Sequence, residues 1–192
     1  MVRNTQQSSP WIKRILAGGI LATASIGVVT VNEGFSPSSY QDSAGIWTIC
    51  YGETKDVKAG QVKTKLQCDA QLQESLKQHG SVLNDVPEDI PAVVALGALD
   101  MAYNIGVSGF NNSTAKKWII LRDYKRAGEA VLSWRYITRN GKKYDCSQLV
   151  NGKPNKVCWG LWQRRQWEAK AIGNQFKTPQ EAVDALNKLH RG

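Results

Sequence analysis

The chain has 192 residues, 42% of them hydrophobic, which is enough for one domain with a substantial core or for two small lobes sharing a helix. Its net charge of +9 favours an anionic partner, either nucleic acid, anionic lipid or a bacterial wall, and is also compatible with a merely solubilising surface. With two histidines, and four cysteines that form no C-x-x-C pair, the sequence disfavours a metal site, and we expect neither metal nor cofactor.

The N-terminal segment, residues 1–31, contains no acidic residue and has the pattern of an export signal or membrane anchor. Arg3, Lys13 and Arg14 precede a charge-free run over residues 15–31. The run is close to the lower length limit for crossing a bilayer, and Gly, Ser and Thr dilute its apolar residues. We expect a signal-anchor helix here. The alternative is a buried first helix of a cytosolic protein, which the lack of a charged face disfavours.

The segment from residue 32 to residue 62 is rich in glycine and predicts a β-hairpin, with strands over 40–42 and 46–51. A helix is expected over 64–84, because Thr64 to Gln67 has the form of a capping box and apolar residues follow at helical spacing.

The remainder, residues 91–192, is predicted to be mostly helical. The stretch 92–104 is apolar nearly all round, as expected for the central helix of a core. We expect a glycine-bearing turn over 104–112 and a polar loop over 138–158. Further helices are expected over 114–121, 125–134, 160–173 and from 178 towards 190. The sequence therefore predicts an α+β protein, with a small β-hairpin lobe and a larger helical lobe joined by a connecting helix.

Two carboxylates near the predicted hairpin have the environments that glycoside hydrolysis requires. Glu33 ends the apolar run, so partial burial should disfavour its charged form, as a general acid needs. Asp42 lies beside a turn among polar groups and should stay ionised. Strand alternation can bring the Thr48 hydroxyl beside Asp42, where it could help to position a water molecule. Spacing alone is weak support, since a helix-end acid and a turn aspartate are common.

A wider set of residues resembles the phage-type lysozymes, glycoside hydrolase family 24. Glu33-Gly34, Asp42 and Thr48 have the spacing of that family's catalytic signature. Later elements that resemble the family are Tyr103-Asn104-Ile105-Gly106, Gly109-Phe110-Asn111-Asn112-Ser113-Thr114, Trp134, Gly160-Leu161 and Arg164-Arg165. The resemblance covers roughly residues 30–172, and it implies a lysozyme-like fold over residues 32–192.

The resemblance implies a muramidase that cleaves the β-1,4 bond between N-acetylmuramic acid and N-acetylglucosamine in peptidoglycan and so lyses the host cell. Glu33 would protonate the leaving oxygen, and Asp42 with Thr48 would orient or activate the attacking water, with inversion at the anomeric carbon. The residues implied to line the sugar groove are Tyr103, Asn104, Phe110 and Ser113. Core packing is the alternative for Tyr103 and Phe110.

One stretch departs from the family pattern. Where many relatives have Gly-x-Gly-His after the threonine–hydrophobic pair, this chain has Cys50-Tyr51-Gly52-Glu53. Glu53 is thus a third acid near the predicted site, and we expect Glu53→Gln to retain most activity.

The four cysteines allow three pairings, and the alternative is that some are free thiols. We favour Cys50–Cys68, which would tie the hairpin to the connecting helix, and Cys146–Cys158, which would staple a polar loop. No cysteine precedes Cys50, so disulfide exchange with an anchor thiol is excluded.

The front segment resembles the signal-anchor-release class of phage endolysins. That resemblance implies export by the host machinery, tethering in the host inner membrane facing the periplasm, and release of an active monomer. Two other readings remain open: a nucleic-acid-binding protein, suggested by the charge and seven tryptophans, and a catalytically inactive wall-binding module. The dispersed basic residues and the apolar leader disfavour nucleic acid.

Overall fold

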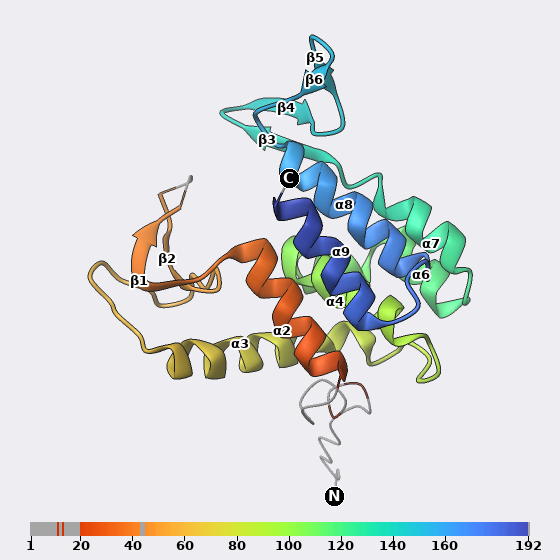
Figure 1. Ribbon diagram of the computed structural model, residues 1–192, viewed down its shortest axis with the longest axis horizontal. Helices are drawn as coiled ribbons and strands as arrows, with labels where there is room; N and C mark the ends of the chain where they lie inside the picture. Colours follow the sequence, from red (N-terminus) through yellow and green to blue (C-terminus); the bar gives the residue numbers. More distant parts are fainter. Residues whose placement is uncertain (1–10, 12, 14–19, 43–44, 192) are drawn as a thin grey trace, which may run out of the picture.

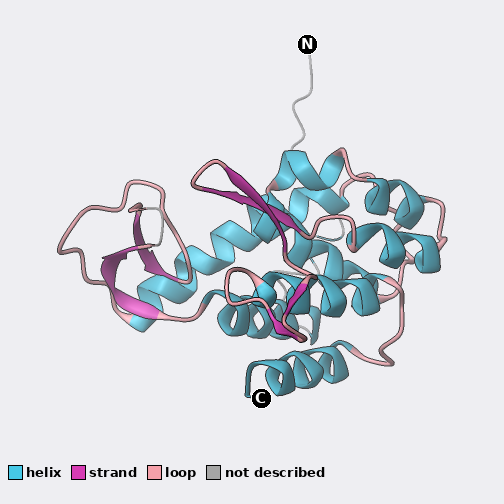
Figure 2. Ribbon diagram, turned by 90° about the horizontal axis from the view of Figure 1, so that it is seen from above, coloured by secondary structure: helices cyan, strands magenta, loops and turns pink. Residues whose placement is uncertain are grey.

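The computed structural model describes residues 11, 13, 20–42 and 45–191, and it has a helical body from which small hairpins project (Figure 1). The described helices are α2 (Ile20–Glu33), α3 (Lys65–Gly80), the short 3-10 helix η1 (Ser81–Leu83), α4 (Ala92–Ile105), α5 (Val107–Asn111), α6 (Thr114–Ile120), α7 (Tyr124–Val131), α8 (Trp159–Ile172) and α9 (Pro179–Arg191). The strands form antiparallel pairs, β1 (Ser36–Gln41) with β2 (Trp47–Cys50), β3 (Tyr136–Arg139) with β4 (Lys142–Asp145), and β5 (Leu149–Val150) with β6 (Lys153–Pro154). This is the predicted α+β architecture, with strands confined to hairpins and helices making up the rest (Figure 2).

The core is built around α4, as its apolar sequence predicts. Ten consecutive residues of this helix, Val93–Ala102, are buried. Helix α8 packs closely against it at Gly97, where an added Cβ would lie 2.8 Å from the Cβ of Ala171. A side chain at position 97 would therefore push the two central helices apart.

The helix that carries Glu33 is α2 (Ile20–Glu33), and it packs against α4 and α9. Leu21, Ala24, Val28 and Val29 are buried in the common core. The part of the predicted anchor run from Ile20 onward thus belongs to a core helix of the folded domain, and the boundary predicted at residue 31 falls inside that helix. Residues 15–19 of that run lie outside the described part of the chain.

Within the described residues, no helix combines the length and the hydropathy needed to cross a bilayer.

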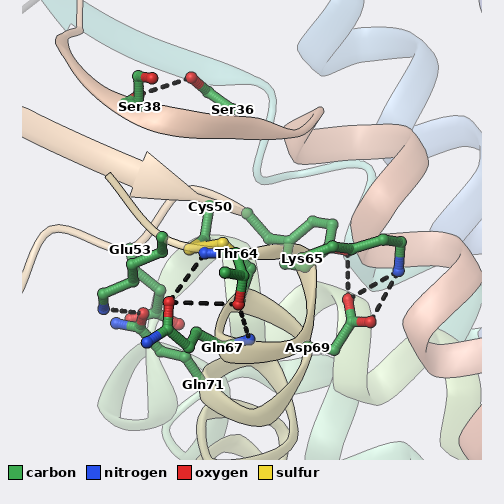
Figure 3. Close-up of a disulfide and its surroundings, with 12 residues drawn as sticks. Ser36, Ser38, Cys50, Glu53, Thr64, Lys65, Gln67, Asp69 and Gln71 are labelled. Atoms are coloured by element: carbon green, nitrogen blue, oxygen red, sulfur yellow. Dashed lines mark hydrogen bonds and ion pairs between the residues drawn. A yellow bond between two sulfur atoms is a disulfide. The ribbon is translucent and has the colours of Figure 1, made fainter. Parts of the chain in front are cut away.

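Helix α3 connects the hairpin lobe to the helical body (Figure 1). Its predicted capping box is confirmed: the Thr64 Oγ1 accepts from the Gln67 backbone N–H at 3.3 Å, and the Gln67 Oε1 accepts from the Thr64 N–H at 2.8 Å. The Cys50–Cys68 disulfide joins β2 to this helix, as predicted (Figure 3). The lobe is therefore attached to the start of α3 by both a covalent bond and a helix cap.

Three segments differ from the sequence-based prediction. The first strand of the hairpin, expected over 40–42, is β1 and begins earlier, at Ser36. The stretch 104–112, expected to be a turn, contains the short helix α5. The stretch 138–158, expected to be a loop, contains the second half of β3 and all of β4, β5 and β6, and the predicted Cys146–Cys158 disulfide closes its last part. Its strands were missed because side chains on both faces are largely exposed, which removes the alternation of apolar and polar residues that marks a half-buried strand.

Candidate active site

Glu33 is the last residue of α2, where the chain leaves the helical body and enters the β1–β2 hairpin. Its side chain is 24% exposed, and its Oε1 accepts a hydrogen bond from Nη1 of Arg164 at 2.7 Å. The other carboxyl oxygen, Oε2, lies near Gly52, just after β2, where an added Cβ would be 3.4 Å from it. Glu33 thus has one oxygen held by a guanidinium and one directed towards the hairpin lobe.

Arg164 is held in turn by Asp100, a buried residue of α4. The guanidinium binds both carboxylate oxygens, Nη2 to Oδ1 at 2.8 Å and Nε to Oδ2 at 3.1 Å. Asn32, the neighbour of Glu33, also donates to Asp100 Oδ1 at 2.9 Å. Such a planar, two-point pair fixes the orientation of the guanidinium, so Asp100 determines how Arg164 meets Glu33.

Two more charged residues complete this buried cluster. Glu168 Oε1 lies 3.5 Å from Arg164 Nε, and Glu168 Oε2 pairs with Arg165. Burial alone would lower the pKa of Arg164, but Asp100, Glu168 and Glu33 together raise it, so this side chain stays cationic. Burial raises the pKa of Glu168, and the neighbouring guanidinium of Arg165 opposes that effect. Three carboxyl groups thus share two guanidinium groups, which leaves Arg164 only partly available to Glu33.

Asp42 and Thr48 lie on the hairpin opposite. Strand pairing sets Thr48 across from Tyr40, two residues before Asp42, so Asp42 and Thr48 occupy diagonal positions on one face. The Asp42 Oδ1 accepts from the Ile46 N–H at 2.9 Å and closes the turn. Thr48 is 4% exposed, and its hydroxyl donates to the Ile46 carbonyl at 3.0 Å.

The residues that depart from the family pattern lie at the end of β2 and just after it. Cys50 has φ = 60°, in the left-handed region that glycine adopts most readily, and the Cys50–Cys68 disulfide holds it there. Glu53 accepts a hydrogen bond from the Tyr103 hydroxyl at 3.4 Å, and that hydroxyl also donates to the Tyr51 carbonyl at 3.2 Å. Burial, followed by the charge of Glu53, raises the pKa of Tyr103, which therefore remains a neutral donor.

The four residues expected to line the groove have different environments. Tyr103 is partly buried, with its ring 4.7 Å from that of His79. Asn104 is exposed and accepts a hydrogen bond from Arg165. Phe110 is fully buried, which corresponds to the core-packing alternative. Ser113 is 3% exposed and caps α6 by accepting from the Lys116 N–H at 3.1 Å. Of these four residues, Tyr103 and Asn104 have exposed surface, whereas Phe110 and Ser113 are buried.

The charged cluster behind Glu33 was not anticipated from the sequence. Asp100 is the only charged residue within the apolar stretch 92–104, and a lone carboxylate at the centre of a core helix indicates a buried cationic partner. That signal could have identified Asp100. It could not have identified the partner as Arg164, which lies 64 positions further along the chain.

A hairpin lobe bearing Asp42, a connecting helix, and a helical lobe bearing Glu33 at the junction together define a lysozyme-like glycoside hydrolase.

Comparison with known proteins agrees with this class. A family model described as phage lysozyme matches residues 30–168. The chain is 30% identical to a SAR-endolysin of Enterobacteria phage P21, over 76% of this chain and 92% of that protein. It is also 30% identical to a SAR-endolysin of Escherichia phage N15, over 88% and 95% of the two chains.

Among solved structures, the endolysin from Escherichia coli O157:H7 phage FAHEc1 superposes with a TM-score of 0.68 at 26% sequence identity. The match covers 83% of this chain and 96% of that one. The chain belongs to the phage lysozyme family, and it is a muramidase that hydrolyses peptidoglycan. This membership disfavours both the nucleic-acid-binding reading and the inactive wall-binding reading.

Proposed function

We propose that Glu33 is the general acid of this muramidase and that Asp42, assisted by Thr48, positions the attacking water. The observation that carries the proposal is the orientation of the Glu33 carboxyl group. Because Oε1 accepts from Arg164, the transferable proton would reside on Oε2, the oxygen directed towards the hairpin that bears Asp42 and Thr48. A glycosidic oxygen bound between helix end and hairpin could receive this proton.

The sharing of Arg164 supports the same role for Glu33. Here Asp100 takes two of the guanidinium donors, and Glu168 lies 3.5 Å from Nε. Arg164 can thus fix the orientation of Glu33 without providing it with a whole compensating charge.

Asp42 suits the role of base because its turn presents the carboxylate to the face shared with Thr48. An inverting hydrolase needs room for water between its two carboxyl groups. Asp42→Asn is expected to slow peptidoglycan hydrolysis by about 100-fold or more. Hydrolysis by the Thr48→Val variant is expected to be slower than hydrolysis by Thr48→Ser, because serine keeps the hydroxyl. Nuclear magnetic resonance of the first products should show the α-anomer; initial release of the β-anomer would contradict this mechanism.

We further infer that residues 1–31 act as a releasable signal-anchor. In this proposal the host machinery exports the chain, the apolar run holds it in the host inner membrane facing the periplasm, and the active monomer is released to the periplasm. The relatives named SAR-endolysin and the weakly apolar run support this proposal. Helix α2 cannot lie in a bilayer and also pack against α4 and α9. Tethering would therefore withdraw Glu33 from Arg164 and keep the enzyme inactive.

A locked anchor tests the tethering proposal. Leu in place of Gly18 and Gly19 should strengthen insertion, retain the protein in the membrane fraction and delay host lysis. Gly27→Leu is a poor choice on its own, because even a Cβ at Gly27 would lie 3.4 Å from Val183 and a leucine would disturb the packing of α2 on α9. Gly18→Ala with Gly19→Ala is the matched control. Lysis as fast with the locked anchor as with wild type would overturn the tethering proposal.

A further inference from the structure

The segment between α7 and α8, residues 135–158, projects from the helical body as two consecutive hairpins, and we call it the arm (Figure 1). It holds six basic residues and one acidic residue, a net charge of +5, against +9 for the whole chain. The basic residues are Arg135, Arg139, Lys142, Lys143, Lys153 and Lys156. More than half of the net charge of the protein thus lies in one eighth of its length.

The arm is firmly held although it buries almost no side chains. The Cys146–Cys158 disulfide closes the part that holds the β5–β6 hairpin, and Asn155 Nδ2 donates to the carbonyls of Cys146 and Gln148 at 2.8 and 3.0 Å. The Asn155 Oδ1 accepts from the Cys158 N–H at 2.9 Å. Within the arm only Cys146 and Asn155 are buried. Its order therefore comes from the disulfide and backbone hydrogen bonds, and its side chains are displayed to solvent.

The displayed side chains on β3 and β4 combine cations with aromatic rings. The Lys143 Nζ lies 4.4 Å from the centre of the Tyr136 ring, and the Lys142 Nζ lies 5.3 Å from that of Tyr144. Over the described residues, no carboxylate forms an ion pair with Arg139, Lys142 or Lys143. The sole acid of the arm, Asp145, pairs with Arg135 at 3.2 Å. The hairpin thus keeps its charge available for an external anion.

Both ends of the arm are connected to the candidate active site. The Trp134 carbonyl, just before the arm, accepts from Arg165 Nε at 3.0 Å, and Arg165 is the neighbour of Arg164. Cys158, at the other end, is the residue from which α8 begins. In Figure 1 the β1–β2 hairpin lies to the left of the end of α2, and the arm projects from the top of the helical body. A polymer bound at Glu33 could therefore extend onto the arm.

We propose that the arm binds the peptide stems of peptidoglycan through their carboxylates. This inference rests on the wall-hydrolysing function given above. Each muramic acid carries a short peptide with free carboxylates, so a glycan strand passing through the site presents a row of anions beyond it. Exposed lysine and arginine match those carboxylates, and the tyrosine rings offer rigid, amphipathic contact area to the stem and the sugar.

A charge-matched pair of variants tests the arm. The arm variant carries Arg139→Gln, Lys142→Gln and Lys143→Gln. The control carries Lys117→Gln, Lys125→Gln and Lys188→Gln, three exposed lysines on α6, α7 and α9. Both lose the same charge, and all six positions are exposed, so the fold should persist in each. Thermal melting followed by circular dichroism checks this.

Binding is measured in a Glu33→Gln background on intact sacculi and on the same glycan after an amidase has removed the stems. The arm variant should bind intact sacculi about 10-fold more weakly than the control, and the difference should vanish on stem-free glycan. An equal loss on both substrates, or an equal loss in the control, would overturn the proposal. The proposal would also be overturned if the arm variant bound sacculi as well as the control but no longer bound phosphatidylglycerol vesicles or DNA. The experiment compares the binding of the arm variant with that of the control, and it does not measure catalysis. An error in assigning Glu33 as the general acid would appear separately, as residual cleavage by Glu33→Gln.

Discussion

Arg164 donates from Nη1 to Glu33 Oε1 at 2.7 Å, and this contact joins the two ends of the catalytic domain across 131 positions of sequence. The same guanidinium binds Asp100 at two points. Helix α2, the central core helix α4 and the late helix α8 thus meet at one side chain. The position of Glu33 depends on all three helices being packed together.

Arg164→Lys tests this dependence. A lysine retains the charge but cannot bond Asp100 at two points and Glu33 at the same time. We expect the free energy of unfolding to fall by about 2 kcal/mol, the value of one lost hydrogen bond between charged groups, and hydrolysis to slow in parallel. Denaturant unfolding and a sacculus-clearing assay measure the two effects. A lysine variant as stable and as active as wild type would mean that the fork geometry of the arginine is dispensable.

Gly52→Ala probes the space around the other oxygen of Glu33. Gly52 has φ = 87°, so alanine should cost about 1 kcal/mol of stability, and its Cβ would lie 3.4 Å from Glu33 Oε2. Gly60→Ala is the matched control, because Gly60 has φ = 74° but no atom within 4 Å of an added Cβ. Both variants should melt at lower temperature, and only Gly52→Ala should also lose activity. Equal activities would show that Glu33 Oε2 does not need this space.

The hairpin disulfide can be tested through the backbone of Cys50. Removing the Cys50–Cys68 link, whose cysteines are 18 positions apart, should cost about 3 kcal/mol of stability. With Cys68→Ser in both, Cys50→Gly should be about 1 kcal/mol more stable than Cys50→Ser, because φ is 60° at this position. Chemical denaturation compares the two proteins. If serine were the better replacement, the left-handed backbone would not explain why relatives have glycine here.

Much of the fold followed from the sequence, because α4 is apolar all round and Thr64 with Gln67 forms a recognisable cap. The hairpin around Asp42 was also predictable from its turn residues. The arm was not, since strands exposed on both faces carry no alternating pattern. The partners of Glu33 were not predictable either. Burial at the end of an apolar helix suggested a hydrophobic surrounding, whereas the structure supplies the guanidinium of Arg164.

Lowering the pH should destabilise the arm by protonating Asp145. The pKa of Asp145 is lowered to about 2, chiefly by the hydrogen bond from the Ser147 hydroxyl, which outweighs the opposing effect of burial. The Ser147 N–H and Arg135 lower this pKa further. A depressed folded-state pKa contributes stability that is fully present above the unfolded value of 3.8 and is lost as pH falls towards 2. Between pH 4 and pH 2, the melting temperature of wild type should therefore fall further than that of Asp145→Asn. Parallel losses in the two proteins would contradict this assignment.

The identity of the general acid is tested most directly by comparing two neighbouring carboxyl groups. Initial rates of peptidoglycan solubilisation should be measured for wild type, Glu33→Gln and Glu53→Gln at one protein concentration. We predict a loss of about 1000-fold for Glu33→Gln, within the range expected for a missing general acid, while Glu53→Gln retains most activity. A loss in Glu53→Gln as deep as that in Glu33→Gln, or substantial activity remaining in Glu33→Gln, would contradict the account.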